Sequence, residues 1–176
     1  MKYFLASILC LSSLLGFAQS INEEQQLISK VIQTAYAEGL QNEGDTLKID
    51  SGFHPNFKMI YKGESLELKE YPLNKWRQRT IEKKAAGKLP RSENNIVTLG
   101  FEFIDVTGDV AVAKVNYFEG GTKTYIDYIS LYKYGEEWKI ISKIFYKLYF
   151  HLFGNLLFPQ IIFLGISISI SSSMVI

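Results

Sequence analysis

Residues 124–146, TYIDYISLYKYGEEWKIISKIFY, carry the pattern that decides the fold. Apolar and aromatic residues dominate both ends of this stretch, and Tyr134-Gly135-Glu136 between them is typical of a tight turn, so we predict two antiparallel strands, 122–134 and 137–146. Side chains alternate along a strand, and the face that carries the aliphatic pair should pack on the core. On strand 122–134 that face carries Tyr125, Asp127, Ile129 and Leu131. A carboxylate is therefore expected in a row of core residues.

The same alternation with period two extends upstream. Two more strands are expected at about 95–106 and 109–118, with turns at Thr107-Gly108-Asp109 and Glu119-Gly120-Gly121. Short turns between long strands make antiparallel neighbours. The second half of the domain is therefore predicted to be a four-stranded antiparallel meander.

The first half of the domain has helical patterns instead. Apolar residues at helical spacing (Leu27, Ile28, Val31, Ile32 and Ala35) predict a helix over 23–38 with one buried face. Asp45 should cap a short helix, 46–51, with Gly52 at its C-cap in a left-handed conformation. A hairpin, FKMIYK and LELKEY, precedes a third helix, 73–83. We predict an α+β fold in which three N-terminal helices pack on one face of a curved antiparallel sheet.

The two ends of the chain differ from this domain, which we place at residues 19–147. Residues 1–18 combine Lys2, an apolar run and the small-x-small site Gly16-Phe17-Ala18, which is typical of a secretory signal peptide and predicts export to the periplasm or the exterior. An uncleaved membrane anchor is the alternative. Residues 148–176 carry no charge and are expected outside the fold, either as a membrane segment or as an extraneous extension.

Composition excludes several classes of protein. The single cysteine, Cys10, lies in the signal segment, so the exported domain would have neither disulfides nor a thiol nucleophile. Without Lys2 the chain has 18 basic and 18 acidic residues, which gives no indication of a nucleic-acid partner. No Gly-rich phosphate loop, HExxH motif, Cys/His metal cluster or G-x-S-x-G motif occurs, so no metal and no cofactor is predicted.

Several segments, in this order, resemble the nuclear transport factor 2-like superfamily: YAEGLQNEGDTLKIDSGFHPNF, Trp76, VTGDVAVAKV, and the final YGEEWKIISK hairpin. The chain is most similar to the secreted branch described as putative lumazine-binding proteins, over residues 21–147. The resemblance implies a conical, cystatin-like α+β fold with a pocket between helices and sheet. It also implies relatives of different function, both isomerases or dehydratases and non-catalytic binders, so the fold alone does not give the function.

Asp127 and His54 are the candidate catalytic residues. A carboxyl group in an apolar pocket tends to be neutral and can then donate a hydrogen bond, and a histidine can act as general base. The structural alternatives are that Asp127 is satisfied by a neighbouring side chain and that His54 supports the bend at His54-Pro55.

Aromatic side chains are the candidate ligand-binding residues. The residues in question are Tyr36, Tyr61, Trp76 and Tyr125, which could stack on a planar ligand or form ordinary core. Basic residues gather on helix 73–83 and in the following loop, either as a solvated face or as a site for an anionic group.

Three functions stay open. The first is an exported protein that binds a small organic molecule in its pocket. The second is a cofactor-independent isomerase or dehydratase that uses Asp127 and His54. The third is an assembly module, a homodimer formed through Ile126, Tyr128 and Tyr132 on the outer face of the sheet.

Overall fold

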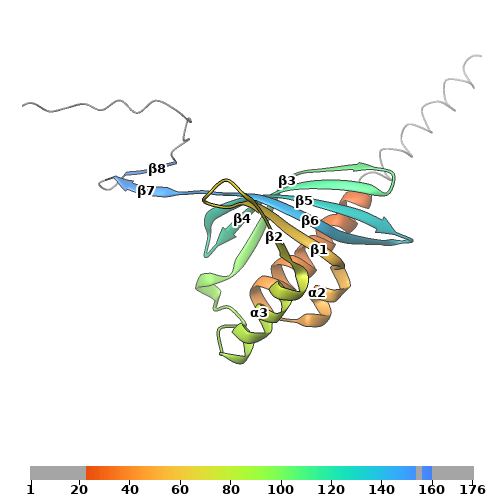
Figure 1. Cartoon of the computed structure of the whole chain (residues 1–176), viewed down its shortest axis with the longest axis horizontal. Coiled ribbons are helices and arrows are strands. Elements are labelled where there is room, and N and C mark those ends of the chain that lie inside the picture. The colour runs from red at the N-terminus through yellow and green to blue at the C-terminus, as the bar shows by residue number, and fades with distance from the viewer. Residues whose placement is uncertain (1–22, 154–155, 160–176) are drawn as a thin grey trace, which may run out of the picture.

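The computed structural model of the 176-residue chain describes residues 23–153 and 156–159, in which helices cover one face of a sheet (Figure 1). The first helix is α-helical over residues 23–31 and continues as the π-helix η1 (Ile32–Glu43). It ends at Gly44, whose φ of 65° is in the left-handed region that glycine adopts without strain. Ile28, Ile32 and Ala35 are fully buried as expected, whereas Leu27 is 45% exposed because it lies beside the apolar stripe.

Two further helices follow. Asp45 caps α2 (Thr46–Gly52) by accepting hydrogen bonds from the backbone N–H groups of Leu47 and Lys48, as predicted. The expected role of Gly52 was wrong: its φ is not positive, and the C-cap is Phe53. Glycine is needed here because a Cβ would lie 2.5 Å from the Cβ of Ala35, so α2 could not pack this closely on η1. The third helix is α3 (Leu73–Ala85).

The sheet has six strands in the order β2-β1-β6-β5-β4-β3. Its strands are β1 (Phe53–Lys62), β2 (Leu68–Pro72), β3 (Val97–Thr107), β4 (Val110–Glu119), β5 (Thr122–Tyr134) and β6 (Glu137–Lys147). The predicted four-stranded meander corresponds to β3–β6, but the hairpin β1–β2 is not separate from it. It extends the same sheet because β1 pairs with β6 in parallel. The predicted fold class, three helices on a curved and mostly antiparallel sheet, is confirmed.

A β-bulge in β6 changes which side chains face the helices. The pairing of β5 with β6 shifts between Ser130↔Ser142 and Leu131↔Ile140, so Ile141 has no partner. Before the bulge, Trp138 and Ile140 point inward; after it, Lys143 and Phe145 do. One extra residue therefore exchanges the two faces of the strand.

The core lies between the helices and the concave face of β4, β5 and β6. On β5 the predicted inward face is confirmed, because Asp127 and Leu131 are both 0% exposed and Ile129 is buried between them. The remaining elements are the short 3₁₀ helix η2 (Glu93–Asn95) and a separate two-stranded sheet of β7 (Phe150–Phe153) and β8 (Leu156–Pro159).

The expected signal peptide, and most of the expected tail, lie outside the described residues. Within residues 23–153 and 156–159, no helix has the length and apolar character that crossing a membrane requires.

Candidate functional site

A cavity of about 440 Å³ opens between the helices and the concave face of the sheet. The volume is within the range of roughly 300–1,000 Å³ that is usual for small-molecule sites. Side chains from η1, β1, α3, the loop after α3, β4, β5 and β6 line it: Tyr36, Gln41, Met59, Trp76, Lys83, Arg91, Tyr117, Glu119, Tyr125, Lys143, Phe145 and Lys147.

A second cavity of about 260 Å³ continues the first one between α3 and β1. The two share Met59, Trp76, Lys83 and Phe145, and the second adds Tyr61, Tyr71 and Arg79. The shared walls mean that one elongated ligand could occupy both.

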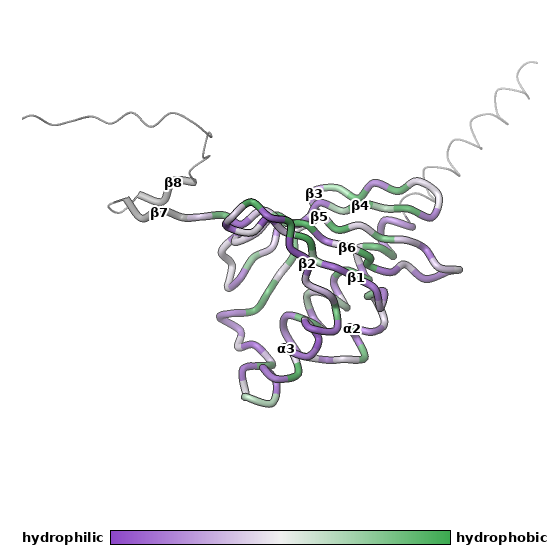
Figure 2. Tube along the Cα trace, viewed as in Figure 1, coloured by the Kyte–Doolittle hydropathy of each residue, from purple (hydrophilic) through white to green (hydrophobic). Residues whose placement is uncertain are grey.

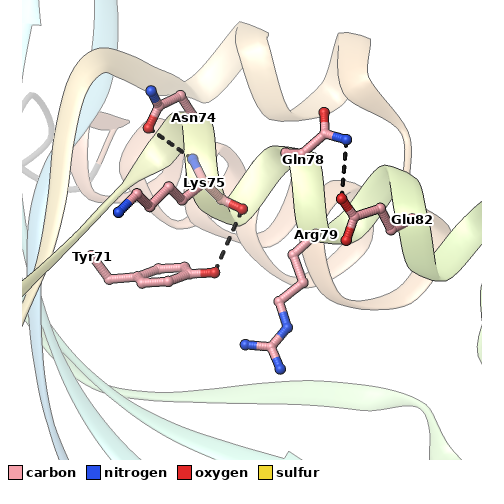
Figure 3. Close-up of a pocket in the computed structure, with 6 residues that line it drawn as sticks. All are labelled: Tyr71, Asn74, Lys75, Gln78, Arg79 and Glu82. Atoms are coloured by element: carbon pink, nitrogen blue, oxygen red, sulfur yellow. Dashed lines mark hydrogen bonds between the residues drawn. The ribbon is translucent and has the colours of Figure 1, made fainter.

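A third hollow, of about 460 Å³, lies on the outer side of α3 (Figure 3). Its lining includes Gln78 and Glu82, and Gln78 Nε2 donates a hydrogen bond to Glu82 Oε1 at 3.1 Å. None of the six residues that line the hollow is buried. Figure 2 shows that α3 is largely hydrophilic. We regard this hollow as a solvated groove on the helix surface and the inner cavity as the candidate site.

The floor of the inner cavity is a buried triangle of Tyr36, Asp127 and Lys143. The Tyr36 hydroxyl donates to Asp127 Oδ2 at 2.8 Å and accepts from Lys143 Nζ at 2.9 Å. Lys143 Nζ also donates to Asp127 Oδ1 at 2.8 Å. Asp127 is 0% exposed and lies behind the other two residues, which reach the cavity. The triangle thus satisfies both carboxylate oxygens and presents an amine and a phenol to a ligand.

Burial controls the protonation of the triangle. It lowers the pKa of Lys143 below its ordinary value, because desolvation disfavours the cation more than Asp127 stabilises it. Burial, together with the charge of Asp127, raises the pKa of Tyr36 well above its ordinary value. Tyr36 is therefore a neutral hydrogen-bonding phenol at physiological pH.

Aromatic side chains form the walls. Tyr36 meets Trp76 edge-on with ring centroids 5.9 Å apart, and Tyr125 meets both Tyr117 and Phe145 at 5.5 and 5.6 Å. Edge-to-face contacts of this kind hold the rings in fixed orientations, so the walls offer a rigid, largely apolar surface to a ligand.

The mouth of the cavity is basic. Lys83, Arg91 and Lys147 line it, and Glu119 contributes the one carboxylate of the lining. Arg91 pairs with Glu119 at 3.2 Å and also donates to the carbonyl oxygen of Gln41 at 2.9 Å, which anchors the loop after α3 to η1.

All four candidate ligand-binding residues line the two cavities: Tyr36, Trp76 and Tyr125 the larger one, Tyr61 and Trp76 the smaller one. The two candidate catalytic residues are not brought together. His54 is the second residue of β1, where its ring stacks on that of Tyr134 with the ring centroids 5.2 Å apart and its Nδ1 accepts a hydrogen bond from the backbone N–H of Asn56 at 3.1 Å. Tyr134 is seven residues from Asp127 along β5, a separation of about 23 Å at the usual rise per residue.

Sequence reasoning missed Lys143, the partner of Asp127. Strict alternation from the buried Trp138 and Ile140 places position 143 on the outer face, and only the bulge at Ile141 turns it inward. The one available signal was Asp127 itself, since a buried carboxylate requires a cation or several donors nearby.

Among the residues that the structure describes, no three His, Cys, Asp or Glu side chains come together as a metal site.

The family model described as putative lumazine-binding matches residues 23–146. No curated protein matches the chain. Three solved structures of NTF2-like proteins of unknown function are similar in fold. That from Silicibacter pomeroyi DSS-3 has a TM-score of 0.58 at 16% identity over 72% of this chain and 98% of the other. The structure from Shewanella baltica OS155 has a TM-score of 0.53 at 19% identity and covers 70% of this chain and 93% of the other. The structure from Methylobacillus flagellatus KT has a TM-score of 0.50 at 20% identity and covers 70% of this chain and 90% of the other.

Proposed function

Because the chain belongs to the putative lumazine-binding family of NTF2-like proteins, we propose that it binds a small planar organic molecule in the cavity between the helices and the sheet. One observation supports this most: a cavity of about 440 Å³ with aromatic walls and a floor whose polar groups are already satisfied. Such a site offers apolar contact area together with a few fixed polar groups, which is what small-molecule sites usually combine.

Binding accounts for the geometry better than catalysis does. A proton-transfer enzyme needs an acid or base in contact with the substrate. Asp127 is fully buried behind Tyr36 and Lys143, with both oxygens hydrogen-bonded, and His54 is stacked on Tyr134 far from the cavity. Binding also accounts for the open cavity, which a pure assembly module would have no reason to keep.

The direct test is a titration of the purified full chain with lumazine, the heteroaromatic molecule in the family's name, followed by calorimetry. We expect saturable binding and a higher melting temperature, since a ligand that binds the native state stabilises it. Trp76→Leu should weaken binding about tenfold by removing a stacking surface.

Tyr128→Leu is the matched control. Tyr128 is an aromatic residue on the outer face of the sheet, so its substitution should leave the affinity unchanged. Equal affinity in the Trp76 and Tyr128 variants would place the ligand outside this cavity. A panel of lumazine and other planar molecules that all fail to bind would contradict the proposed function.

We also propose that the chain is exported and loses residues 1–18. The N-terminal segment supports this with its positive first residues, apolar run and small-x-small site. Mass spectrometry of protein recovered outside the cytoplasm should find Gln19 as the first residue. Recovery only of cytoplasmic protein that begins at Met1 would contradict export.

A further inference from the structure

We infer that the ligand is a planar acid: its ring system lies between the aromatic walls, and its negatively charged group lies at the mouth beside Lys83. This inference rests on the proposed function and adds the charge and the orientation of the ligand. Four observations, from α3, from the ion pairs of the site, from the environment of Lys83 and from the position of Lys143, support it.

The inner face of α3 carries an aromatic residue and two cations. Trp76, Arg79 and Lys83 are spaced by three and four residues, so they lie along one side of the helix. Trp76 and Lys83 line both cavities, and Arg79 lines the smaller one. Arg79 also borders the outer hollow, where Figure 3 shows its side chain directed away from the Gln78–Glu82 pair. A ligand that stacks on Trp76 would therefore have cations within reach along the same helix.

The ion pairs of the site leave the mouth with excess positive charge. Lys143 is paired with Asp127 at the floor, and Arg91 with Glu119 at the mouth. Among the residues that the structure describes, Arg79, Lys83 and Lys147 have no carboxylate partner. Lys83 and Lys147 line the larger cavity, and Arg79 and Lys83 line the smaller one. A cleft lined mainly by one sign of charge concentrates the electrostatic potential and attracts ions of the opposite sign.

The environment of Lys83 reflects this crowding of like charges. Its pKa is lowered first by partial burial and then by the neighbouring Arg91 and Arg79, with Glu119 opposing the shift. An acidic group bound here would offset this repulsion and accept charge-assisted hydrogen bonds from the ammonium group.

The deep end of the cavity disfavours a cationic ligand, although aromatic walls often bind cations. Lys143 Nζ already occupies that position, 4.9 Å from the ring centre of Tyr36, 5.7 Å from Trp76 and 5.0 Å from Phe145. Its charge is compensated by Asp127, so the deep end suits an uncharged ring. A second cation would meet Lys143 inside and Lys83 outside.

Three probes with one ring system and different charges test this inference: 2-naphthoate, 2-naphthamide and 2-naphthylmethylammonium. Each is titrated into the full chain by calorimetry at low and high salt. We expect the acid to bind about tenfold more tightly than the amide and the ammonium compound to bind most weakly. Added salt should weaken binding of the acid and leave that of the amide unchanged, because salt screens the charges at the mouth.

Lys83→Met should lower the affinity for the acid to that for the amide while the amide binds as before. Lys83 makes no side-chain hydrogen bond to a described residue, so the fold should tolerate the change. Lys75→Met is the matched control: it removes a lysine from the outer side of α3 and should change neither affinity.

The outcomes separate the two proposals. If the amide binds as tightly as the acid, or if Lys83→Met leaves their ratio unchanged, the inference of a planar acid is wrong while the proposed binding function stands. If none of the three probes binds while lumazine does, the inference of a planar acid is wrong and the proposed binding function stands. If lumazine and the other planar molecules fail as well, both proposals fail.

Discussion

Asp127 shows how one residue can serve the fold and the site together. A carboxylate that is 0% exposed would be very costly in an apolar core, but here it accepts hydrogen bonds from Tyr36 and Lys143 on both oxygens. Its charge compensates that of Lys143 below the cavity and fixes the Tyr36 hydroxyl in one orientation. The residue therefore supports the floor of the site without touching the ligand.

Removal of one member of this pair should destabilise the protein far more than removal of both. We expect Lys143→Met to lower the free energy of unfolding by about 3–5 kcal/mol, because Asp127 would stay buried without its cation. The double variant Lys143→Met/Asp127→Val should recover much of this loss, since it leaves no unpaired buried charge and valine is only slightly larger than aspartate.

Urea unfolding of the wild type, both single variants and the double variant gives the coupling energy directly. Additive losses in the double variant would mean that the two residues act independently, which contradicts this account of the floor.

At the scale of elements, the first helix is tied to the β5–β6 hairpin by one carboxylate. Glu24 accepts from Lys133 Nζ and from Trp138 Nε1, both at 2.6 Å. These hydrogen bonds hold the pKa of Glu24 below its ordinary value, and the same contact raises the pKa of Lys133. This contact positions the helix that goes on to supply Tyr36.

Glu24→Gln should lower stability at neutral pH and flatten the acid side of the stability profile. A carboxylate whose pKa is lower in the folded than in the unfolded protein stabilises the fold at pH values above its unfolded-state pKa, near 4.5. This contribution is lost as the pH falls through the pKa of the folded state. The amide does not titrate, so the variant should lose less stability than the wild type between about pH 6 and pH 3.

The expected cost at neutral pH is about 1–3 kcal/mol, since a hydrogen bond to a charged group is lost. Glu23→Gln, at the exposed neighbouring position, is the control and should follow the wild type. Parallel acid profiles for the wild type and Glu24→Gln would show that the contact does not stabilise the fold.

At the scale of the whole molecule, the helices cover one face of the sheet and leave the other face open (Figure 1). Phe103, Lys114, Tyr128 and Ile144 lie directly opposite one another across four strands of that face. Of the three residues expected there, Tyr128 and Tyr132 are exposed and Ile126 is half-buried. Phe103, Tyr128 and Ile144 are exposed apolar or aromatic residues in this row, and Lys114 between them is paired with Glu102. A patch of this kind on the outer face can pair with itself under a two-fold axis, so a second copy of the chain is the partner that we expect.

We therefore predict a homodimer through the outer face, which sedimentation equilibrium would detect. Tyr128→Glu combined with Ile144→Lys should give a monomer that keeps its ligand affinity, because the cavity is on the opposite face. Leu47→Glu, at an exposed leucine of α2, should leave the dimer intact. A wild-type monomer at micromolar concentration would contradict the prediction.

The sequence by itself determined the elements and the face of β5 that turns to the core. Side chains repeat every 3.6 residues along a helix and every 2 along a strand, and both periods are local properties of the chain. The sequence therefore predicted two buried faces residue by residue: Ile28, Ile32 and Ala35 on the first helix, and Asp127, Ile129 and Leu131 on β5. Asp45 as a cap follows from equally local chemistry.

Only the tertiary structure decided which residues meet at the site. The parallel pairing of β1 with β6 and the bulge at Ile141 depend on how distant strands fit together. The bulge reverses the alternation, so Lys143 reaches Asp127 across β5 and β6, while His54 lies at the far end of the sheet. Contacts between residues far apart in the chain depend on register, and a shift of one residue moves a side chain from the solvent to the core.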